Sequence, residues 1–467
     1  MQTPHRNLLN GLRTPVLVFI ACVSPASAQA PPDNPALEQI LNRLDRLEQQ
    51  NRELVQEVRA LRNELARART DQVQPQPETS PTESTPAGDL AERVAVQGQR
   101  IEDQAQTKVE ASQRFPIRIT GMALFNASLS SKPSFGWAVP IVAPLSGTAL
   151  TGTATLRQSI IGLDFNGPDT FGGGKVRGFL NLDFFGGSGE SYDSLIRLRT
   201  AGVQVDWAAT SIMFGQDKPL IAPREPNSLA QVGFSPLTGA GNLWAWQPQA
   251  RVEQRFSIDE RTTIRAQAGV FATREDNAYV PPAYASAEFQ NVRPALQTRL
   301  SFTHALDDNR RLEIGSGFGA STTHFAGASV PSRVFTLDWF ANPWRKLEFS
   351  GAFFHGQNLA NLGGLGQGFI VREYAVIPVH ANGGWAQASF IATRRLTFNL
   401  FGGEQANRNQ DIQYHSLAAN QAYAANLMYR LAPNVILSFE AGQVRTNYFG
   451  VGNRLNNYHD LGFAYLF

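Results

Sequence analysis

From Phe115 to the C-terminus the chain alternates apolar and polar residues with a period of two. In one such segment Ile264 and Val270 share one face, while Arg265 lies on the other. This period predicts β-strands with two unlike faces. Breaks in the alternation divide this part of the chain into sixteen predicted strands. The strands span residues 117–129, 153–166, 175–186, 194–207, 210–217, 248–258, 262–273, 294–305, 310–321, 332–341, 344–356, 383–393, 395–405, 420–431, 434–446 and 455–467.

The connections between the predicted strands alternate between short turns and long loops. The connection 322–331 and the connection 447–454 are among those we expect to be long. A soluble β-sandwich also alternates along its strands, but regular short and long connections with an even strand count favour an up-and-down barrel in an outer membrane. The expected fold is therefore all-β, a 16-stranded antiparallel transmembrane β-barrel over residues 115–467, with both of its ends on the short-turn, periplasmic side.

The alternation of the last predicted strand indicates which of its residues face lipid and which face the interior of the barrel. Phe463, Tyr465 and Phe467 share one face, and we expect it to point toward lipid, with Asp460 and Ala464 facing the interior. Aromatic residues gather at the membrane interface of such barrels. We predict that these three aromatic residues form a membrane-assembly signal, with the barrel assembly machinery and outer-membrane lipid as partners.

The N-terminal residues have the features of a secretory signal peptide. Basic residues come first, an apolar run follows over 16–23, and Ala26-Ser27-Ala28 forms an A-x-A cleavage site. This predicts a signal peptide over residues 1–28. An alternative is a lipoprotein signal in which Cys22 becomes the acylated first residue. Under the first interpretation Cys22, the one cysteine of the chain, is removed and the mature protein forms no disulfide.

A heptad repeat follows the signal and predicts a periplasmic α-helical coiled coil over residues 29–69. Its a and d positions are Leu37, Ile40, Leu44, Leu47, Asn51, Leu54, Val58, Leu61, Leu65 and Ala68. Asn51 at a buried a position would fix register and oligomeric state. We expect a homo-oligomer, but these positions do not separate dimer from trimer, and a lone amphipathic helix is the alternative. A Pro-rich linker is predicted over 70–88 and a weak helical spacer over 89–114.

Composition and charge narrow the classes of function. The chain has 467 residues, 17% of them charged, with a mean hydropathy of -0.23 and a formal net charge of +2. It lacks the roughly 18 consecutive apolar residues of a membrane helix, so a membrane span must be a barrel. It also lacks a basic cluster interleaved with aromatic residues, which argues against nucleic acid as a partner.

The sequence offers few signs of catalysis. Its seven histidines are not at metal-ligand spacings, and Gly172-Gly173-Gly174-Lys175 fits a turn better than a phosphate loop. We therefore expect no enzyme activity, no metal and no cofactor. A Ser-His-Asn or Ser-His-Asp lipase site on the outer wall is the alternative that the sequence leaves open.

In this order of parts, a secretion signal, a coiled coil and a barrel ending in Phe467, the chain resembles the DcaP-like family of trimeric outer-membrane porins. More distantly it resembles the phosphate-selective porins O and P. The local matches are the Arg-bearing segment 196–199 and the segment 214–219, where a strand end opens a long loop. The resemblance implies a trimeric porin in the outer membrane of a Gram-negative-type bacterium.

A barrel of sixteen strands encloses a water-filled lumen, so the residues that narrow it decide what passes. We predict that the long connection 218–247 folds inward and that Lys218, Arg224 and Glu225 form the pore constriction. The alternative is that these residues face solvent on the loop. Charges at polar-phase wall positions face water, because a charge on the lipid face costs about 2–4 kcal/mol. The predicted wall residues are Arg177, Arg197, Arg199, Arg251, Arg255, Arg265 and Arg299.

Two of these arginines lie where the predicted strand 194–207 changes face midway. Ile196 and Leu198 have one parity, whereas Val203 and Val205 have the other. We expect a β-bulge near Ala201-Gly202 to reconcile the two halves.

Residues 116–467 contain 28 Lys and Arg against 24 Asp and Glu, and Arg far outnumbers Lys. Guanidinium groups bind carboxylate and phosphate through paired hydrogen bonds. We expect passive diffusion of small hydrophilic solutes, with a modest preference for anions such as organic acids or phosphate-like ions. The alternative function is a structural tether that joins the outer membrane to the cell wall, with peptidoglycan as a partner.

Overall fold

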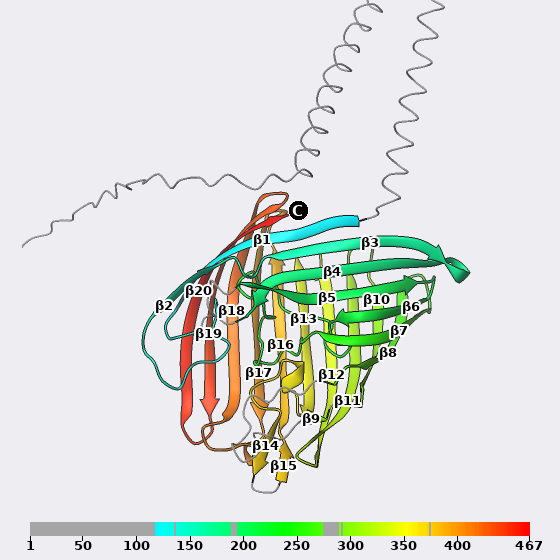
Figure 1. Cartoon of the computed structure of the whole chain (residues 1–467). Helices are drawn as coiled ribbons and strands as arrows, with labels where there is room; N and C mark the ends of the chain where they lie inside the picture. Colours follow the sequence, from blue (N-terminus) through cyan, green and yellow to red (C-terminus); the bar gives the residue numbers. More distant parts are fainter. Residues whose placement is uncertain (1–116, 135–136, 188–193, 274–288, 291–292, 373–374) are drawn as a thin grey trace, which may run out of the picture. The chain divides into compact units, whose positions relative to one another are not determined.

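The computed structural model describes residues 117–134, 137–187, 194–273, 289–290, 293–372 and 375–467. The predicted signal peptide, coiled coil, linker and spacer lie outside these residues. The described residues include one 18-stranded antiparallel sheet, and none of their helices is long and apolar enough to cross a bilayer. In this sheet β2 and β3 both pair with β1, one after the other, so together they form one strand of the wall. β9 has only two residues and pairs with the end of β11, so it is not counted as a wall strand. The wall is therefore a 16-stranded antiparallel barrel (Figure 1).

The wall strands agree closely with the predicted ones. They are β1 (Ile117–Ser130), β2 (Thr151–Thr155) with β3 (Ile160–Thr170), β4 (Gly174–Gly186), β5 (Leu195–Asp206), β6 (Thr210–Asp217), β7 (Gln247–Ser257), β8 (Thr262–Phe271), β10 (Ala295–Ala305), β11 (Arg311–Phe325), β12 (Ala328–Trp344), β13 (Leu347–Gln357), β16 (His380–Ile391), β17 (Leu396–Asn407), β18 (Leu417–Ala432), β19 (Val435–Tyr448) and β20 (Gly452–Leu466). The shorter elements are β9 (Phe289–Gln290), a hairpin of β14 (Phe369–Arg372) and β15 (Ala375–Pro378), and the 3-10 turns η1 (Phe171–Gly173), η3 (Ala360–Leu362) and η4 (Asn409–Asp411).

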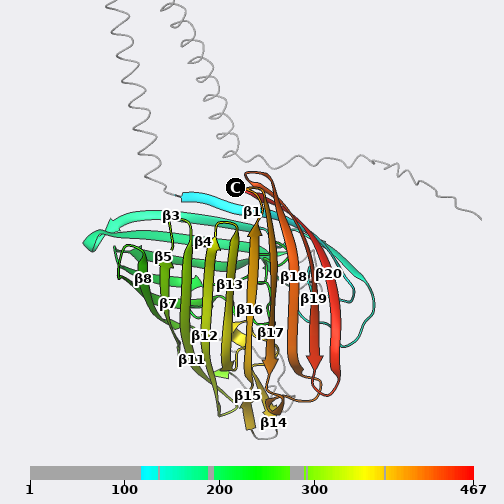
Figure 2. The ribbon, with the colours of Figure 1, turned by 180° about the vertical axis from the view of Figure 1, so that it is seen from behind.

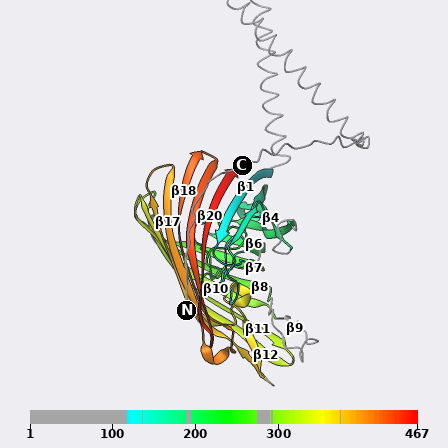
Figure 3. The same cartoon turned by 90° about the vertical axis from the view of Figure 1, so that its left-hand side faces the viewer.

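The barrel closes between its first and last strands. β1 pairs antiparallel with β20, with Phe125 opposite Phe463, and the two strands lie side by side in Figure 3. β11 to β13 and β16 to β20 form the neighbouring wall, which Figure 2 shows from behind. The hairpin of β14 and β15 lies at the rim opposite the C-terminus.

Two connections that were predicted to be long are short. β11 and β12 continue their pairing to Phe325 and Ala328 and turn through residues 326–327, both with positive φ. Such two-residue turns match the twist of paired strands, so the ladder extends to the turn. β19 and β20 are likewise joined by residues 449–451 alone. The predicted loops 322–331 and 447–454 are therefore wrong, and paired strands occupy most of both.

A β-bulge in β5 resolves the change of face that the sequence shows. Opposite β4, Leu198 pairs with Leu182 and Thr200 with Asn181, so Arg199 is the extra residue. The predicted bulge exists, but it lies two residues before Ala201. Its effect is to let Leu198 and Val203, which have opposite parity, both face outward, where they are 43% and 51% exposed. Arg197 and Arg199 point inward, where both bind Asp183.

The outward and inward faces of the wall differ sharply in polarity. At the closing strand Phe463, Tyr465 and Phe467 are 45%, 46% and 50% exposed, whereas Asp460 and Ala464 are buried. This alternation has the phase that the sequence predicts. The inward face carries many buried polar side chains, among them Asn126, Gln297, Asp338 and Glu440.

Among the described residues, three connections reach into the barrel, and one of them also carries the hairpin of β14 and β15 at the rim. Residues 131–150 reach the wall where the Ala143 amide donates to Thr446 Oγ1 at 2.8 Å, and residues 358–379 where the Leu365 amide donates to Gln405 Oε1 at 2.8 Å. The third is 218–246. Apolar side chains of these loops join inward-facing wall residues in two buried clusters. One cluster contains Val139, Leu237, Trp385, Phe401 and Tyr458; the other contains Ile221, Leu243, Phe354, Leu359 and Leu362.

Candidate functional site

The connection 218–246 crosses the lumen and touches the wall on widely separated strands. The Leu220 amide donates to Gln297 Oε1 of β10 at 2.9 Å. The Asn227 amide donates to Gln387 Oε1 of β16 at 2.6 Å. Farther along the loop, Leu229 O accepts from Asn126 of β1 at 2.8 Å. Because these three strands lie far apart around the barrel, the loop spans the interior and narrows it.

Gln158, in the break between β2 and β3, holds the next stretch of the loop. Its Oε1 accepts from the amides of Val232 and Gly233, both at 2.7 Å, and its Nε2 donates to Ala230 O at 2.9 Å. The side chain is buried, so each of these polar atoms would be costly to leave unpaired. One side chain thus satisfies three backbone groups of the loop.

A buried carboxylate of β19, Glu440, binds the loop directly, and a second one of β20, Asp460, acts on it through Asn126. Glu440 accepts from Ser228 Oγ at 2.6 Å and from Asn426 Nδ2 at 2.9 Å. Asp460 lies directly opposite Glu440 in the sheet and accepts from Asn126 at 3.0 Å. The strand phase predicts the inward side of Asp460, but it does not predict that either carboxylate takes part in holding the loop.

Lys218 and Glu225, two of the predicted constriction residues, form an ion pair of 2.7 Å, and both are partly exposed. Glu225 also accepts from Ser235 Oγ at 2.7 Å. Burial favours the neutral acid, but the ammonium and hydrogen bond of Lys218, with the Ser235 hydroxyl, outweigh it and lower the pKa of Glu225 below its ordinary value. The pair therefore presents both charges beside the lumen.

Arg224, the third predicted constriction residue, is held by two carboxylates. It contacts Glu313 at 2.6 Å and Asp338 at 3.1 Å, and its side chain is 16% exposed. Arg299 shares both acids, at 2.8 Å from Asp338 and 3.3 Å from Glu313. This four-residue network joins the loop to β10, β11 and β12, so Arg224 contributes little free positive charge.

Arg197 and Arg199 meet a single buried carboxylate at the β5 bulge. Arg197 makes two hydrogen bonds with Asp183, at 2.6 and 3.0 Å, and Arg199 makes one at 3.0 Å. Both guanidinium groups also bind loop carbonyls, Arg197 that of Gly233 and Arg199 that of Val232. Arg199 lies 4.6 Å from the Trp246 ring centroid, a cation–π distance. The arginines therefore clamp the loop to the wall.

The other predicted wall arginines also lie within 4 Å of acids. Arg251 contacts Asp217 at 3.0 Å, and Glu253 lies 3.7 Å from Arg255 and 3.4 Å from Arg265. Arg177 is more exposed, 3.8 Å from Asp206. Together with Arg197, Arg199 and Arg299, all seven predicted wall arginines have an acidic neighbour among the described residues, as expected for ion pairs that are partly structural.

A cavity of about 430 Å³ lies between the loop and the turn that joins β16 to β17. Arg394 and Arg395 of this turn and Arg430 of β18 line it. The loop contributes residues 225–229 to its lining. Among the described residues, none of these three arginines has a carboxylate within ion-pair distance, in contrast to the seven above. The sequence analysis missed this cavity, which we call the arginine vestibule. The polar phase of Arg430 and the paired arginines in a tight turn were its available signals.

Metal binding finds no support in this part of the molecule. Within the described ranges, His, Cys, Asp and Glu do not form a group of three or more that could hold an ion. The described side chains that bind the loop are arginines, carboxylates and amides.

Comparison with known proteins adds the fold class. Neither a protein-family model nor a curated protein matches the chain. Among solved structures, the outer membrane channel DcaP of Acinetobacter baumannii is similar with a TM-score of 0.62 and 14% identity, over 75% of this chain and 97% of that one. An anion-selective porin from Comamonas acidovorans is similar with a TM-score of 0.51 and 11% identity, over 75% and 99%. The described barrel therefore shares its fold with outer-membrane porins.

Proposed function

We propose that this protein is an outer-membrane channel for passive diffusion of small hydrophilic solutes, with a modest preference for anions such as organic acids or phosphate-like ions. The observation that carries the proposal is the loop 218–246 across the lumen, which borders the arginine vestibule. Arginines without acidic partners keep their charge available to a passing anion. Their planar guanidinium groups bind carboxylate and phosphate through paired hydrogen bonds.

The outward face supports a location in a membrane. Its exposed apolar side chains, including Phe463 and Tyr465, fit lipid, and the short-turn rim with the C-terminus would face the periplasm. We propose that Phe463, Tyr465 and Phe467 act as the membrane-assembly signal. We also propose that three copies assemble through barrel and coiled coil, which native mass spectrometry of the full chain would test.

Planar-bilayer recording of the purified full chain tests the proposed channel. We expect ion-conducting steps, and the triple variant Arg394→Gln, Arg395→Gln, Arg430→Gln should lower the ratio of anion to cation permeability. The matched control is Arg333→Gln, because Arg333 is exposed and in the outward phase of β12. A triple variant with wild-type permeability would contradict the role of the vestibule.

A second candidate function is the cell-wall tether, with the barrel as an anchor. The inward folding of three loops, with buried apolar clusters between them and the wall, favours it, since a filled barrel conducts little. A chain that never conducts, but sediments with isolated peptidoglycan only when residues 29–69 are present, would support the tether over the channel.

A further inference from the structure

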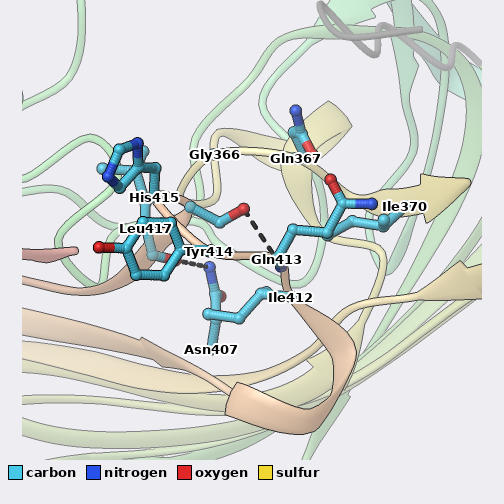
Figure 4. A pocket seen from close by; sticks show the side chains of 10 residues that line it. Gly366, Gln367, Ile370, Asn407, Ile412, Gln413, Tyr414, His415 and Leu417 are labelled. Carbon is cyan, nitrogen blue, oxygen red and sulfur yellow. Dashed lines mark hydrogen bonds between the residues drawn. The ribbon is translucent and has the colours of Figure 1, made fainter. Parts of the chain in front are cut away.

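A second cavity lies away from the constriction, between the loops 358–379 and 408–416 (Figure 4). Its volume is about 370 Å³, within the range of small-ligand pockets. Ile370 and Ile412 line it and are both buried in an apolar cluster with Val379 and Ala418. This cluster gives the cavity a fixed, apolar wall.

Tyr414 supplies an exposed aromatic surface to the cavity. Its side chain is 65% exposed, and its ring stacks on the imidazole of His415 with centroids 4.3 Å apart and planes at 29°. His415 has a positive φ of 70°, a left-handed backbone conformation that is uncommon outside glycine. Gly450 leaves room for the ring, because a Cβ there would collide with Tyr414. The phenol is thus positioned by its neighbours and yet largely exposed.

Two glutamine side chains offer unused hydrogen-bonding groups in the same cavity. Gln367 and Gln413 are half-buried, and their amide groups make no hydrogen bond to other described residues. Figure 4 shows both side chains beside Ile370. Asn407, by contrast, is fully engaged, since it donates to Leu417 O at 2.9 Å and accepts from Gln405 at 3.1 Å. Each free amide can donate two hydrogen bonds and accept others from hydroxyl groups.

The charge of the lining restricts the ligand. It contains no Asp, Glu, Lys or Arg, and His415 is its one basic side chain. An anion or cation would find no fixed counter-charge in this lining, unlike in the arginine vestibule. The guanidinium of Arg372 lies outside the lining and donates to the carbonyl of Ile412. A neutral ligand with an apolar face for the phenol and hydroxyl groups for the amides fits this lining.

We propose that this cavity binds a neutral hexose unit of a saccharide. The proposal rests on the proposed function for one point, the exposure of this rim at the cell surface. There the hexose would come either from a free saccharide or from the carbohydrate of a surface lipid. Both sources present the same ring face and hydroxyl groups to Tyr414, Gln367 and Gln413.

Saturation-transfer difference NMR on the detergent-solubilised full chain tests the site, with glucose, galactose and maltose as probes. We expect saturation transfer from the wild type to at least one probe and a loss of at least tenfold in affinity for Tyr414→Ala. The double variant Gln367→Ala, Gln413→Ala should also weaken binding, whereas Tyr414→Phe should retain it. The control Tyr423→Ala removes an exposed tyrosine outside the cavity and should bind as the wild type does.

Vesicles distinguish the two sources. Binding of the wild type to lipopolysaccharide-containing vesicles but not to phospholipid vesicles, lost in Tyr414→Ala, would assign the hexose to a surface lipid even if free sugars fail. Failure of both probes, or binding that Tyr414→Ala leaves unchanged, would overturn the inference. Bilayer conductance of the same preparation separates the two proposals: a conducting chain without saccharide binding refutes this inference alone, and a binding chain that never conducts refutes only the channel.

Discussion

Asp338, which the sequence analysis does not single out, joins the constriction loop to the wall within the network of Arg224, Arg299 and Glu313. Its buried carboxylate accepts from Arg224 of the loop at 3.1 Å and from Arg299 of β10 at 2.8 and 2.9 Å. Removing one partner of a buried ion pair leaves an uncompensated charge, which is costlier than losing an exposed pair. The loss of the Asp338 carboxylate should therefore lower the free energy of unfolding.

We expect Asp338→Asn to lower the free energy of unfolding by about 3–5 kcal/mol, the usual cost of breaking a buried pair. Denaturant unfolding followed by tryptophan fluorescence would measure this. The control is Asp307→Asn, which removes a 2.8 Å ion pair with Arg310 in an exposed turn and should stay close to the wild type. Equal destabilisation by both variants would contradict the account of the network.

Glu225 should make the selectivity depend on pH. The pKa of Glu225 is below its ordinary value, so its ion pair with Lys218 is complete above the ordinary glutamate range and is lost only as pH falls through the lowered pKa. We expect Glu225→Gln to raise the anion preference at neutral pH, because Lys218 is then unopposed. Reversal potentials recorded from pH 7 downward should show the wild type approaching the variant only below the ordinary glutamate range. A wild type that already matches the variant at pH 7 would contradict this.

For single residues, the sequence predicts which face of the strand a side chain occupies better than it predicts the residue with which that side chain pairs. The polar phase of the strands indicated that Arg251, Arg265 and Arg299 face inward, because the alternation of each strand is local. Ion pairing depends on which loop returns to which strand, and the bond of Arg224 to Asp338 joins residues 114 positions apart. Pairing with loop residues was therefore beyond what a local pattern can show.

The loop 218–246 is the element on which the proposed function most depends. Backbone groups and side chains of this loop bind β1, β5, β10, β16 and the break between β2 and β3. Hydrogen bonds to so many strands oppose any movement of the loop out of the lumen toward the rim of the barrel. We infer that the loop sets the width of the path at all times rather than opening as a mobile lid.

Deletion of residues 226–235 should raise the single-channel conductance and weaken the ion preference, since it removes most of the segment across the lumen. Ser228→Ala is the control, because it removes the 2.6 Å hydrogen bond to Glu440 but keeps the loop. Its conductance should stay near that of the wild type. If the deletion leaves conductance unchanged, the constriction lies elsewhere, and the loops 131–150 and 358–379 become the candidates.

The strands were predictable because each buries one face, which repeats every two residues. The inward folding of 131–150 and 358–379 was not, because no local pattern marks it. These loops are held by buried clusters that join residues far apart in the chain. One cluster contains both Val139 and Trp385, and the other contains both Leu362 and Ile221. The two-residue turn at 326–327 was missed for a similar reason, since its strands extend as far as cross-strand pairing continues.

Across the whole molecule, the arginines fall into two kinds. Seven wall arginines lie near acids and hold the loop or the wall, whereas the three of the arginine vestibule have no described acidic partner. Paired charges largely cancel at a distance, so the vestibule should dominate the field that a solute meets. The anion preference that we propose would thus be a property of the assembled barrel. It cannot be summed from the composition, in which basic and acidic residues nearly balance.

The reversal potential of the full chain in a planar bilayer, under a tenfold gradient of potassium chloride, tests this claim most directly. We predict a reversal potential whose sign shows that chloride is more permeant than potassium. Raising the ionic strength should bring this potential closer to zero, because salt screens the charges of the vestibule. A reversal potential of the opposite sign, showing preference for potassium, would contradict it.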